Sequence, residues 1–252
     1  MVRLLLTLCF IYSAQVISQE SEYKYVPERN TAEYYFGSFN KGKEISDVAK
    51  WYGEFAKWAA TQGDVYDSMT VALLQPYYHR DLASHDFMWV STWPDSATQF
   101  KGLEAWTKDS KANALFAKLP AKNSQVVSTV QWAISQPRST DAGNFILAQY
   151  NSCKLNEGTN LRTYYDAYVD FAKMAQENGD VQGRKLIIPG PGYDGDADFI
   201  RLVYTSAVSE RGEGIEFWRS ELRDTDERLA LVGMADCGNG SIYVGPVLRS
   251  PN

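Results

Sequence analysis

Hydrophobic residues recur at helical spacing in residues 41–65, KGKEISDVAKWYGEFAKWAATQGDV. Ile45, Val48, Tyr52 and Phe55 fall on one face of a 3.6-residue period, and polar residues lie between them. This pattern predicts an amphipathic helix. The GDV tripeptide supplies a glycine suited to a helix C-cap, so we expect the helix to end there.

The same pattern occurs a second time in residues 157–181, EGTNLRTYYDAYVDFAKMAQENGDV, with FAK and GDV at matching places. Further along, HDFMWVSTW (85–93) is matched by ADFIRLVYT (197–205), and GLEAW (102–106) by GIEFW (214–218). Collinear matches of this kind predict an internal duplication. The repeat is longer than the roughly 20–50 residues of a solenoid unit, so we expect two whole domains.

Each copy has the pattern strand, helix, strand, strand, helix, strand. In the first copy, strands are expected at 33–39, 68–78, 86–93 and 125–134, and helices at 45–59 and 96–119. In the second copy, strands are expected at 144–155, 184–193, 198–206 and 240–248, with one helix ending at Asn178 and another at 214–232.

This element order is the split βαβ, or ferredoxin-like, pattern. Two such units in tandem resemble the dimeric α/β-barrel superfamily in its single-chain duplicated form, without pointing to one family. The resemblance implies an α+β fold of two βαββαβ units, residues 30–135 and 144–250, joined by a polar linker at 136–143. It also implies that the two sheets pack face to face around a central cavity, with the helices outside. Packing through the helices is the alternative.

The N-terminus, MVRLLLTLCFIYSAQVISQE, has one arginine before an apolar run and small residues after it. This is typical of a cleaved signal peptide, expected at residues 1–18. The run is shorter than the roughly 20 residues that span a bilayer, so we expect no membrane span in the mature chain. A buried first strand or an uncleaved anchor is the alternative. The protein is expected to be exported, periplasmic or extracellular.

Composition narrows the set of partners. The 252 residues carry a net charge of −6, and 13% of them are aromatic. An acidic chain without basic clusters argues against a nucleic-acid or anionic-membrane surface. A fused pair supplies its own internal partner, so we expect a monomer or a weak homo-oligomer.

Two cysteines, Cys153 and Cys237, lie outside the predicted signal peptide. In a ferredoxin-like sheet the first and fourth strands are antiparallel neighbours. Cys153 lies at the exit of the first strand and Cys237 just before the fourth, so both are expected at one edge. In an exported protein this placement predicts a structural disulfide. A catalytic thiol is the alternative, which the lack of histidine in the second copy disfavours.

Strand alternation sorts the ligand-binding candidates. We assign Trp89 and Arg201 to the cavity, and expect Gln149 and Asn151 to point inward with Arg201. A buried arginine needs an anionic partner, which is either a ligand or a carboxylate such as that of Asp198. The positions that alternate with these along the same strands carry only apolar side chains, and we assign them to the face that packs against the helices: Met88, Val90, Ile200 and Leu202.

The two histidines, His79 and His85, lie in the loop between the second and third strands. Histidine is a common general base and metal ligand, so His79 is a further candidate. A solvated polar loop explains both residues equally well, and we predict no metal site. Recognisable catalytic motifs are absent from the sequence, so no catalytic residue is assigned.

These observations predict an exported protein that binds a small, partly apolar ligand in an aromatic-lined cavity between the two units. The alternative is a cofactor-independent oxygenase-like enzyme of the dimeric α/β-barrel type, with Trp89, Arg201 and His79 as its candidates. An interaction module using exposed aromatics is a third possibility. The superfamily also includes heme-dependent chlorite dismutases, whose iron-ligating histidine is expected in the second copy. That copy has no histidine, so we predict no cofactor.

Overall fold

The computed structural model describes residues 23–138 and 145–251. The expected signal peptide, 1–18, and most of the expected linker, 136–143, lie outside the described residues. The first half contains β1 (Arg29–Phe39), α1 (Ile45–Ala59), β2 (Thr70–Tyr78), β3 (Phe87–Trp93), α2 (Ser96–Lys108), α3 (Ser110–Phe116) and β4 (Ala121–Ser135). The second half contains β5 (Phe145–Leu155), α4 (Leu161–Glu177), β6 (Gly183–Pro189), β7 (Phe199–Thr205), α5 (Val208–Phe217), a π-helical turn (Trp218–Leu222), α6 (Asp226–Met234), β8 (Ala235–Cys237) and β9 (Ser241–Arg249).

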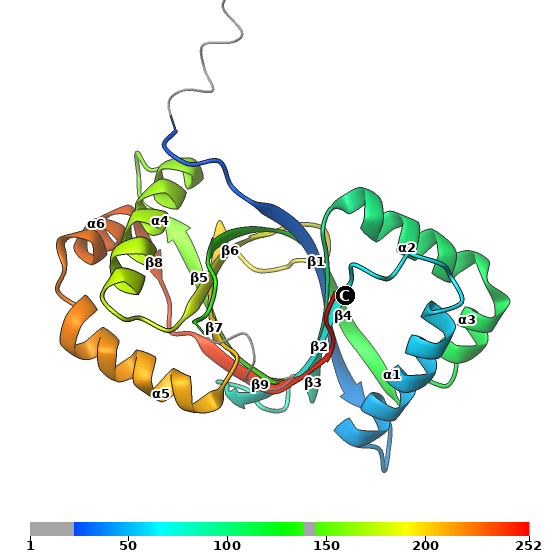
Figure 1. Cartoon of the computed structure of the whole chain (residues 1–252). Coiled ribbons are helices and arrows are strands. Elements are labelled where there is room, and N and C mark those ends of the chain that lie inside the picture. Colours follow the sequence, from blue (N-terminus) through cyan, green and yellow to red (C-terminus); the bar gives the residue numbers. More distant parts are fainter. Residues whose placement is uncertain (1–22, 139–144, 252) are drawn as a thin grey trace, which may run out of the picture.

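Eight of the strands form one closed antiparallel barrel, in the order β7-β6-β4-β1-β3-β2-β9-β5, with β5 pairing back to β7 (Figure 1). The halves contribute four adjacent strands each, β4-β1-β3-β2 and β9-β5-β7-β6. The edge strands of the two halves pair with each other, β4 with β6 and β2 with β9. The predicted pair of facing sheets is therefore a single sheet closed on itself, which leaves these strands no open edge.

Helices cover two opposite sides of the barrel: α1, α2 and α3 lie on one side, and α4, α5 and α6 on the other (Figure 1). Met88, Val90 and Leu202 pack inside the barrel with other aliphatic and tyrosine side chains. Trp89 and Arg201 point outward, beneath the helices. The sequence grouped these residues correctly by face, but the assignment of the faces was wrong. Because Met88 and Val90 of β3 face the interior, strand alternation places Trp89 on the outer surface, in the layer beneath the helices.

Two predicted helices are interrupted. The helix expected at 96–119 is two helices, because the Asp109 carboxylate caps α3 by accepting a hydrogen bond from the Lys111 amide at 2.8 Å. The same carboxylate accepts a hydrogen bond from Trp58 Nε1 at 2.8 Å. The helix expected at 214–232 is likewise divided into the end of α5, the π-helical turn and α6.

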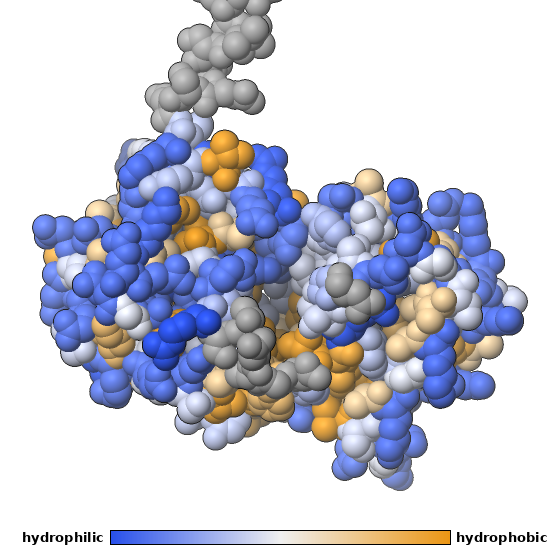
Figure 2. Space-filling model, in the orientation of Figure 1, coloured by the Kyte–Doolittle hydropathy of each residue, from blue (hydrophilic) through white to orange (hydrophobic). Residues whose placement is uncertain are grey.

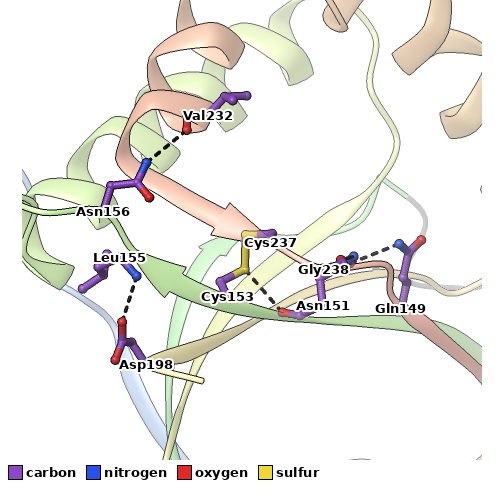
Figure 3. Close-up of a disulfide and its surroundings, with 9 residues drawn as sticks. All are labelled: Gln149, Asn151, Cys153, Leu155, Asn156, Asp198, Val232, Cys237 and Gly238. Carbon is purple, nitrogen blue, oxygen red and sulfur yellow. Dashed lines mark hydrogen bonds between the residues drawn. A yellow bond between two sulfur atoms is a disulfide. The ribbon is translucent and has the colours of Figure 1, made fainter. Parts of the chain in front are cut away.

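The predicted disulfide between Cys153 and Cys237 is confirmed, with Cα atoms 4.1 Å apart (Figure 3). Cys237 lies in β8, a short strand that the sequence did not predict, which pairs with β5 so that the two cysteines are direct partners. A disulfide that closes a long loop typically stabilises a domain by about 2–4 kcal/mol. The Cys153–Cys237 disulfide fixes the segment between α6 and β9 to the C-terminal end of β5.

Most of the surface seen in Figure 2 is hydrophilic, and hydrophobic residues gather near the middle of that face, where the two halves meet. Within residues 23–138 and 145–251, no helix has the length and apolar character needed to cross a membrane.

The closure between β2 and β9 depends on Gly245. A Cβ atom at this position would overlap the carbonyl oxygen of Leu73 in β2. We expect Gly245→Ala to lower the free energy of unfolding by about 1–3 kcal/mol, because the strands must move apart to accept the methyl group. Gly233→Ala in α6 is the control, since nothing lies within 4 Å of its Cβ position. Urea unfolding measures both variants, and equal destabilisation would contradict the role of Gly245.

Candidate functional site

Two pockets lie between the outer surface of the barrel and the helices, one in each half, at equivalent positions. Trp89 of β3 is paired with Tyr35 of β1, and Arg201 of β7 is paired with Asn151 of β5. Trp89 and Arg201 therefore occupy equivalent positions in the two halves. One pocket is basic and the other is aromatic with a single acidic residue.

The arginine pocket of the second half has a volume of about 270 Å³. It is defined by four arginines from four different elements, namely Arg184 (β6), Arg201 (β7), Arg211 (α5) and Arg228 (α6). No acidic residue is among its lining residues. Four guanidinium groups around one pocket give it a strongly positive potential.

Only one of the four arginines has an ion-pair partner among the described residues. Arg184 pairs with Asp180, and both side chains are buried. Arg201 was expected to meet either a ligand or Asp198, but the Asp198 carboxylate accepts a hydrogen bond from the Leu155 amide at 2.8 Å instead (Figure 3). The Nε atom of Arg201 is buried without a hydrogen-bond partner in the described part of the chain.

The guanidinium groups repel one another. Burial and the neighbouring Arg184 both lower the pKa of Arg211. Burial and the neighbouring Arg201 likewise lower the pKa of Arg228. All four groups stay protonated, because an arginine side chain does not lose its proton in proteins. The pocket therefore holds positive charges that the described side chains do not balance.

Two amide side chains hold the Arg211 guanidinium in place. Gln149 Oε1 and Gln182 Oε1 accept hydrogen bonds from Arg211. Gln149 Nε2 donates to Asn151 Oδ1 at 3.1 Å, and Asn151 Nδ2 donates to the carbonyl of Gly238 at 2.9 Å (Figure 3). Gly238 follows Cys237, so the disulfide-bonded segment supports this chain of hydrogen bonds. Three of the five predicted candidates, Arg201, Gln149 and Asn151, thus line one pocket.

Apolar groups form the other walls of the arginine pocket: Phe171, Val203, Ile215, Trp218 and Leu231. The repeated glycine of GIEFW, Gly214, lets α5 approach the barrel closely, because a Cβ atom there would lie 2.6 Å from the Gln182 side chain. Gly102 of GLEAW has the same role in the first half, against the Trp93 ring. This packing role gives the repeated sequence a structural reason.

The aromatic pocket of the first half has a volume of about 140 Å³. Its lining has one carboxylate, that of Glu33, and several large aromatic side chains, among them Trp51, Phe55, Tyr66, Trp89, Trp93 and Trp106. Trp89, the fourth predicted candidate, lies here and donates a hydrogen bond from Nε1 to Ser91 Oγ at 2.8 Å. The sequence prediction that Trp89 and Arg201 share one cavity is wrong, because they lie on opposite sides of the barrel.

A third pocket of about 190 Å³ lies inside the barrel, lined in part by Tyr34, Phe36, Tyr150, Tyr193 and Tyr243. It corresponds in place and character to the aromatic-lined cavity expected between the two halves. None of the five predicted candidates lines it, because all of their positions on the strands face outward or belong to a loop.

His79, the fifth candidate, lies in the loop after β2. Its ring is 5.3 Å from that of His85 and 5.7 Å from that of Tyr243. His85 Nε2 and Tyr243 Oη are 3.1 Å apart, and burial, with a contribution from His79, lowers the pKa of His85. Among the described residues, no three His, Cys, Asp or Glu side chains gather as metal ligands would. The three residues named for an oxygenase, Trp89, Arg201 and His79, occupy three separate places.

Sequence reasoning missed Arg184, Arg211 and Arg228. Arg211 and Arg228 lie on helices, where an arginine in a polar stretch is indistinguishable from a solvated one. Arg184 begins a strand whose alternation places it on the same face as Leu186, which packs under α4. That alternation was the one available signal, and it required the correct assignment of the inner and outer faces.

No protein-family model matches the sequence, and no curated protein matches it. Solved structures with a similar fold include a mutant chlorite dismutase from Candidatus Nitrospira defluvii, with 12% identity and a TM-score of 0.49, covering 91% of this chain and 96% of that chain. An anthrone oxidase-like protein has 11% identity and a TM-score of 0.49, covering 88% and 92%. A heme-binding protein from Thermus thermophilus has 9% identity and a TM-score of 0.45, covering 89% and 95%.

The prediction that the protein has no cofactor is corrected by the last of these structures, which is a heme-binding protein. Heme iron is held in proteins by histidine, cysteine, methionine or tyrosine. The arginine pocket has only Tyr168 of this set among its lining residues, and burial raises the pKa of its phenol. A raised pKa opposes the phenolate needed for iron ligation, so this donor set does not fit a ligated heme. The lining fits an anionic group instead.

Lys185 lies inside the barrel, at the end opposite the histidines. Its Nζ donates to Gln131 Oε1 at 3.1 Å, and Gln131 Nε2 donates to Tyr34 Oη at 2.7 Å. Burial lowers the pKa of Lys185 from its ordinary value of 10.5 to about 8. At pH 7 the amine is charged in both the folded and the unfolded chain, so the full cost of burying the charge is present.

We expect Lys185→Met to raise the free energy of unfolding at pH 7 by about 1 kcal/mol or more, because the buried charge is removed. Between about pH 8 and pH 10.5 the wild-type amine is neutral when folded but charged when unfolded, so wild-type stability rises and the advantage of the variant shrinks. Urea unfolding from pH 7 to pH 10 measures the difference. Lys122→Met, at an exposed position, is the control and should show no such trend. A difference for Lys185→Met that is independent of pH would contradict the lowered pKa.

Proposed function

We propose that this protein binds a small anionic molecule with an apolar portion in the arginine pocket. The observation that carries the proposal is the set of Arg201, Arg211 and Arg228, which line one pocket and have no ion-pair partner among the described residues. Charged groups withdrawn from water are costly unless they are paired. An anionic ligand supplies the missing partner.

The electrostatics of the arginine pocket favour recognition of the ligand's negative charge over recognition of its size. Burial, and after it a neighbouring guanidinium, lowers the pKa values of Arg211 and Arg228. An anion between the guanidinium groups replaces repulsion with attraction. Charge-assisted hydrogen bonds from arginine are about twice as strong as neutral ones, and the planar fork of donors fits a carboxylate or a phosphate.

The surroundings define the rest of the ligand. Phe171, Trp218 and Leu231 offer apolar contacts beside the arginines, so an organic anion fits better than an inorganic ion. Gln149 accepts a hydrogen bond from Arg211 and is in turn hydrogen-bonded to Asn151, so both are positioning residues. They hold the Arg211 donors in place before the ligand arrives, which reduces the entropic cost of binding.

The two halves, residues 30–135 and 144–250, are in this proposal duplicated ferredoxin-like units. The corresponding strand orders β4-β1-β3-β2 and β9-β5-β7-β6 support this. Closure of the barrel within one chain supports a monomer. The disulfide Cys153–Cys237 supports an exported protein, because disulfides persist in oxidising compartments.

Isothermal titration calorimetry of the full chain with benzoate, phenyl phosphate and the neutral benzamide tests the proposal. At least one of the two anions should bind, and at least tenfold more tightly than benzamide. Arg201→Gln should weaken binding of that anion about 10- to 100-fold, since a hydrogen bond to a charged group contributes about 1.5–3 kcal/mol.

Arg219→Gln is the matched control, because Arg219 lies in the same half, is exposed, and pairs with Glu216 at 2.7 Å outside the pocket. It should leave anion binding unchanged. Equal affinity for benzoate, phenyl phosphate and benzamide, no binding of either anion, or equal effects of the two arginine variants would each overturn the proposal.

A further inference from the structure

The aromatic pocket of the first half has one charged residue. Glu33 points outward from β1, is half-buried, and is the only ionisable acid or base among the pocket's lining residues other than its tyrosines. Among the described residues its carboxylate takes part in no ion pair. The charge lies beneath α1, α2 and α3, beside a cavity, without a cation to balance it.

Two tyrosine hydroxyls, those of Tyr35 and Tyr66, lie near the Glu33 carboxylate. Burial, with a contribution from the Glu33 carboxylate, raises the pKa of Tyr35 and of Tyr66. Tyr66 donates its hydroxyl to the carbonyl of Gly102 at 2.7 Å, so that group is already occupied. Glu33 lines the aromatic pocket together with both tyrosines.

The aromatic rings form a connected wall around the same space. The Trp89 ring is 5.9 Å from Trp51 and 6.2 Å from Phe55, and Phe55 is 5.6 Å from Trp106. The Tyr66 ring is 5.6 Å from that of Trp93. Aromatic faces attract cations, and tryptophan does so most strongly. The cation–π contacts within the described residues involve other rings, so these faces have no cationic partner there.

The equivalent positions in the second half carry different side chains. Glu33 is paired with Ser91 across β1 and β3, as Gln149 is paired with Val203 across β5 and β7. The second half thus has a neutral amide in place of Glu33, and Arg201 in place of Trp89. The same backbone presents a carboxylate with aromatic faces on one side of the barrel and guanidinium groups on the other.

We propose that the aromatic pocket is a second binding site, which takes a small organic cation: an amine or quaternary ammonium group with small apolar substituents. Glu33 balances the charge, and the faces of Trp89, Trp51 and Trp106 contact the substituents. An enclosed apolar cavity of about 150 Å³ can hold a molecule the size of benzene, so a volume of about 140 Å³ suits a cation of this size. The inference is independent of the anion proposed for the arginine pocket.

Calorimetry of the full chain with choline chloride and with 3,3-dimethyl-1-butanol, its neutral isostere, tests this inference at constant ionic strength. Choline should bind at least tenfold more tightly than the alcohol, since both fill the same volume and only one carries a charge. Glu33→Gln should reduce choline affinity about tenfold or more and leave the alcohol unaffected.

Glu54→Gln, on the exposed face of α1 and outside the pocket, changes the net charge by the same amount and should leave choline binding unchanged. The wild-type comparison of the two probes does not depend on a variant, so it remains decisive if Glu33→Gln fails to fold. Equal affinity for choline and the alcohol, no binding of choline, or equal effects of the two variants would each overturn the inference.

Discussion

The hydrogen bonding between the two halves, β4 to β6 and β2 to β9, is the constraint on which the rest of the structure depends. Each four-stranded half alone would expose two unpaired edges, which are prone to pair with other chains. Joining the edges within one chain closes the barrel and sets its diameter. An eight-stranded barrel is filled mainly by side chains, so most of the space for ligands lies outside it, beneath the helices.

That outer layer is where the halves differ. The strands hold equivalent positions in the same register, and the repeated Gly102 and Gly214 bring a helix close to the barrel in both halves. The side chains at those positions differ in charge, with Glu33 and Trp89 on one side and Gln149 and Arg201 on the other. The two halves thus have pockets at equivalent positions, and a few different side chains give one pocket a carboxylate and the other guanidinium groups.

The buried and half-buried charges differ in how they are balanced. The Arg184 guanidinium has Asp180, and the Lys185 amine has an amide oxygen and a lowered pKa. Arg201, Arg211 and Glu33 have no ion-pair partner among the described residues. Inside a protein a charge is stabilised by a counter-charge, by hydrogen bonds or by a ligand, or it is removed by a proton shift. Arginine does not lose its proton at physiological pH, so Arg201 stays charged, and an anionic ligand is the partner proposed for it.

The sequence by itself predicted the order of the main strands and helices, the grouping of Trp89 and Arg201 on the face opposite Met88 and Leu202, and the pairing of Cys153 with Cys237. These depend on local spacing and on strand adjacency, which the pattern of residues contains. Only the tertiary structure decided which face of each strand lies inside, because that depends on how two sheets join. It also decided that Arg184, Arg201, Arg211 and Arg228 meet, since residues on separate strands and helices come together only when helices dock on a closed barrel.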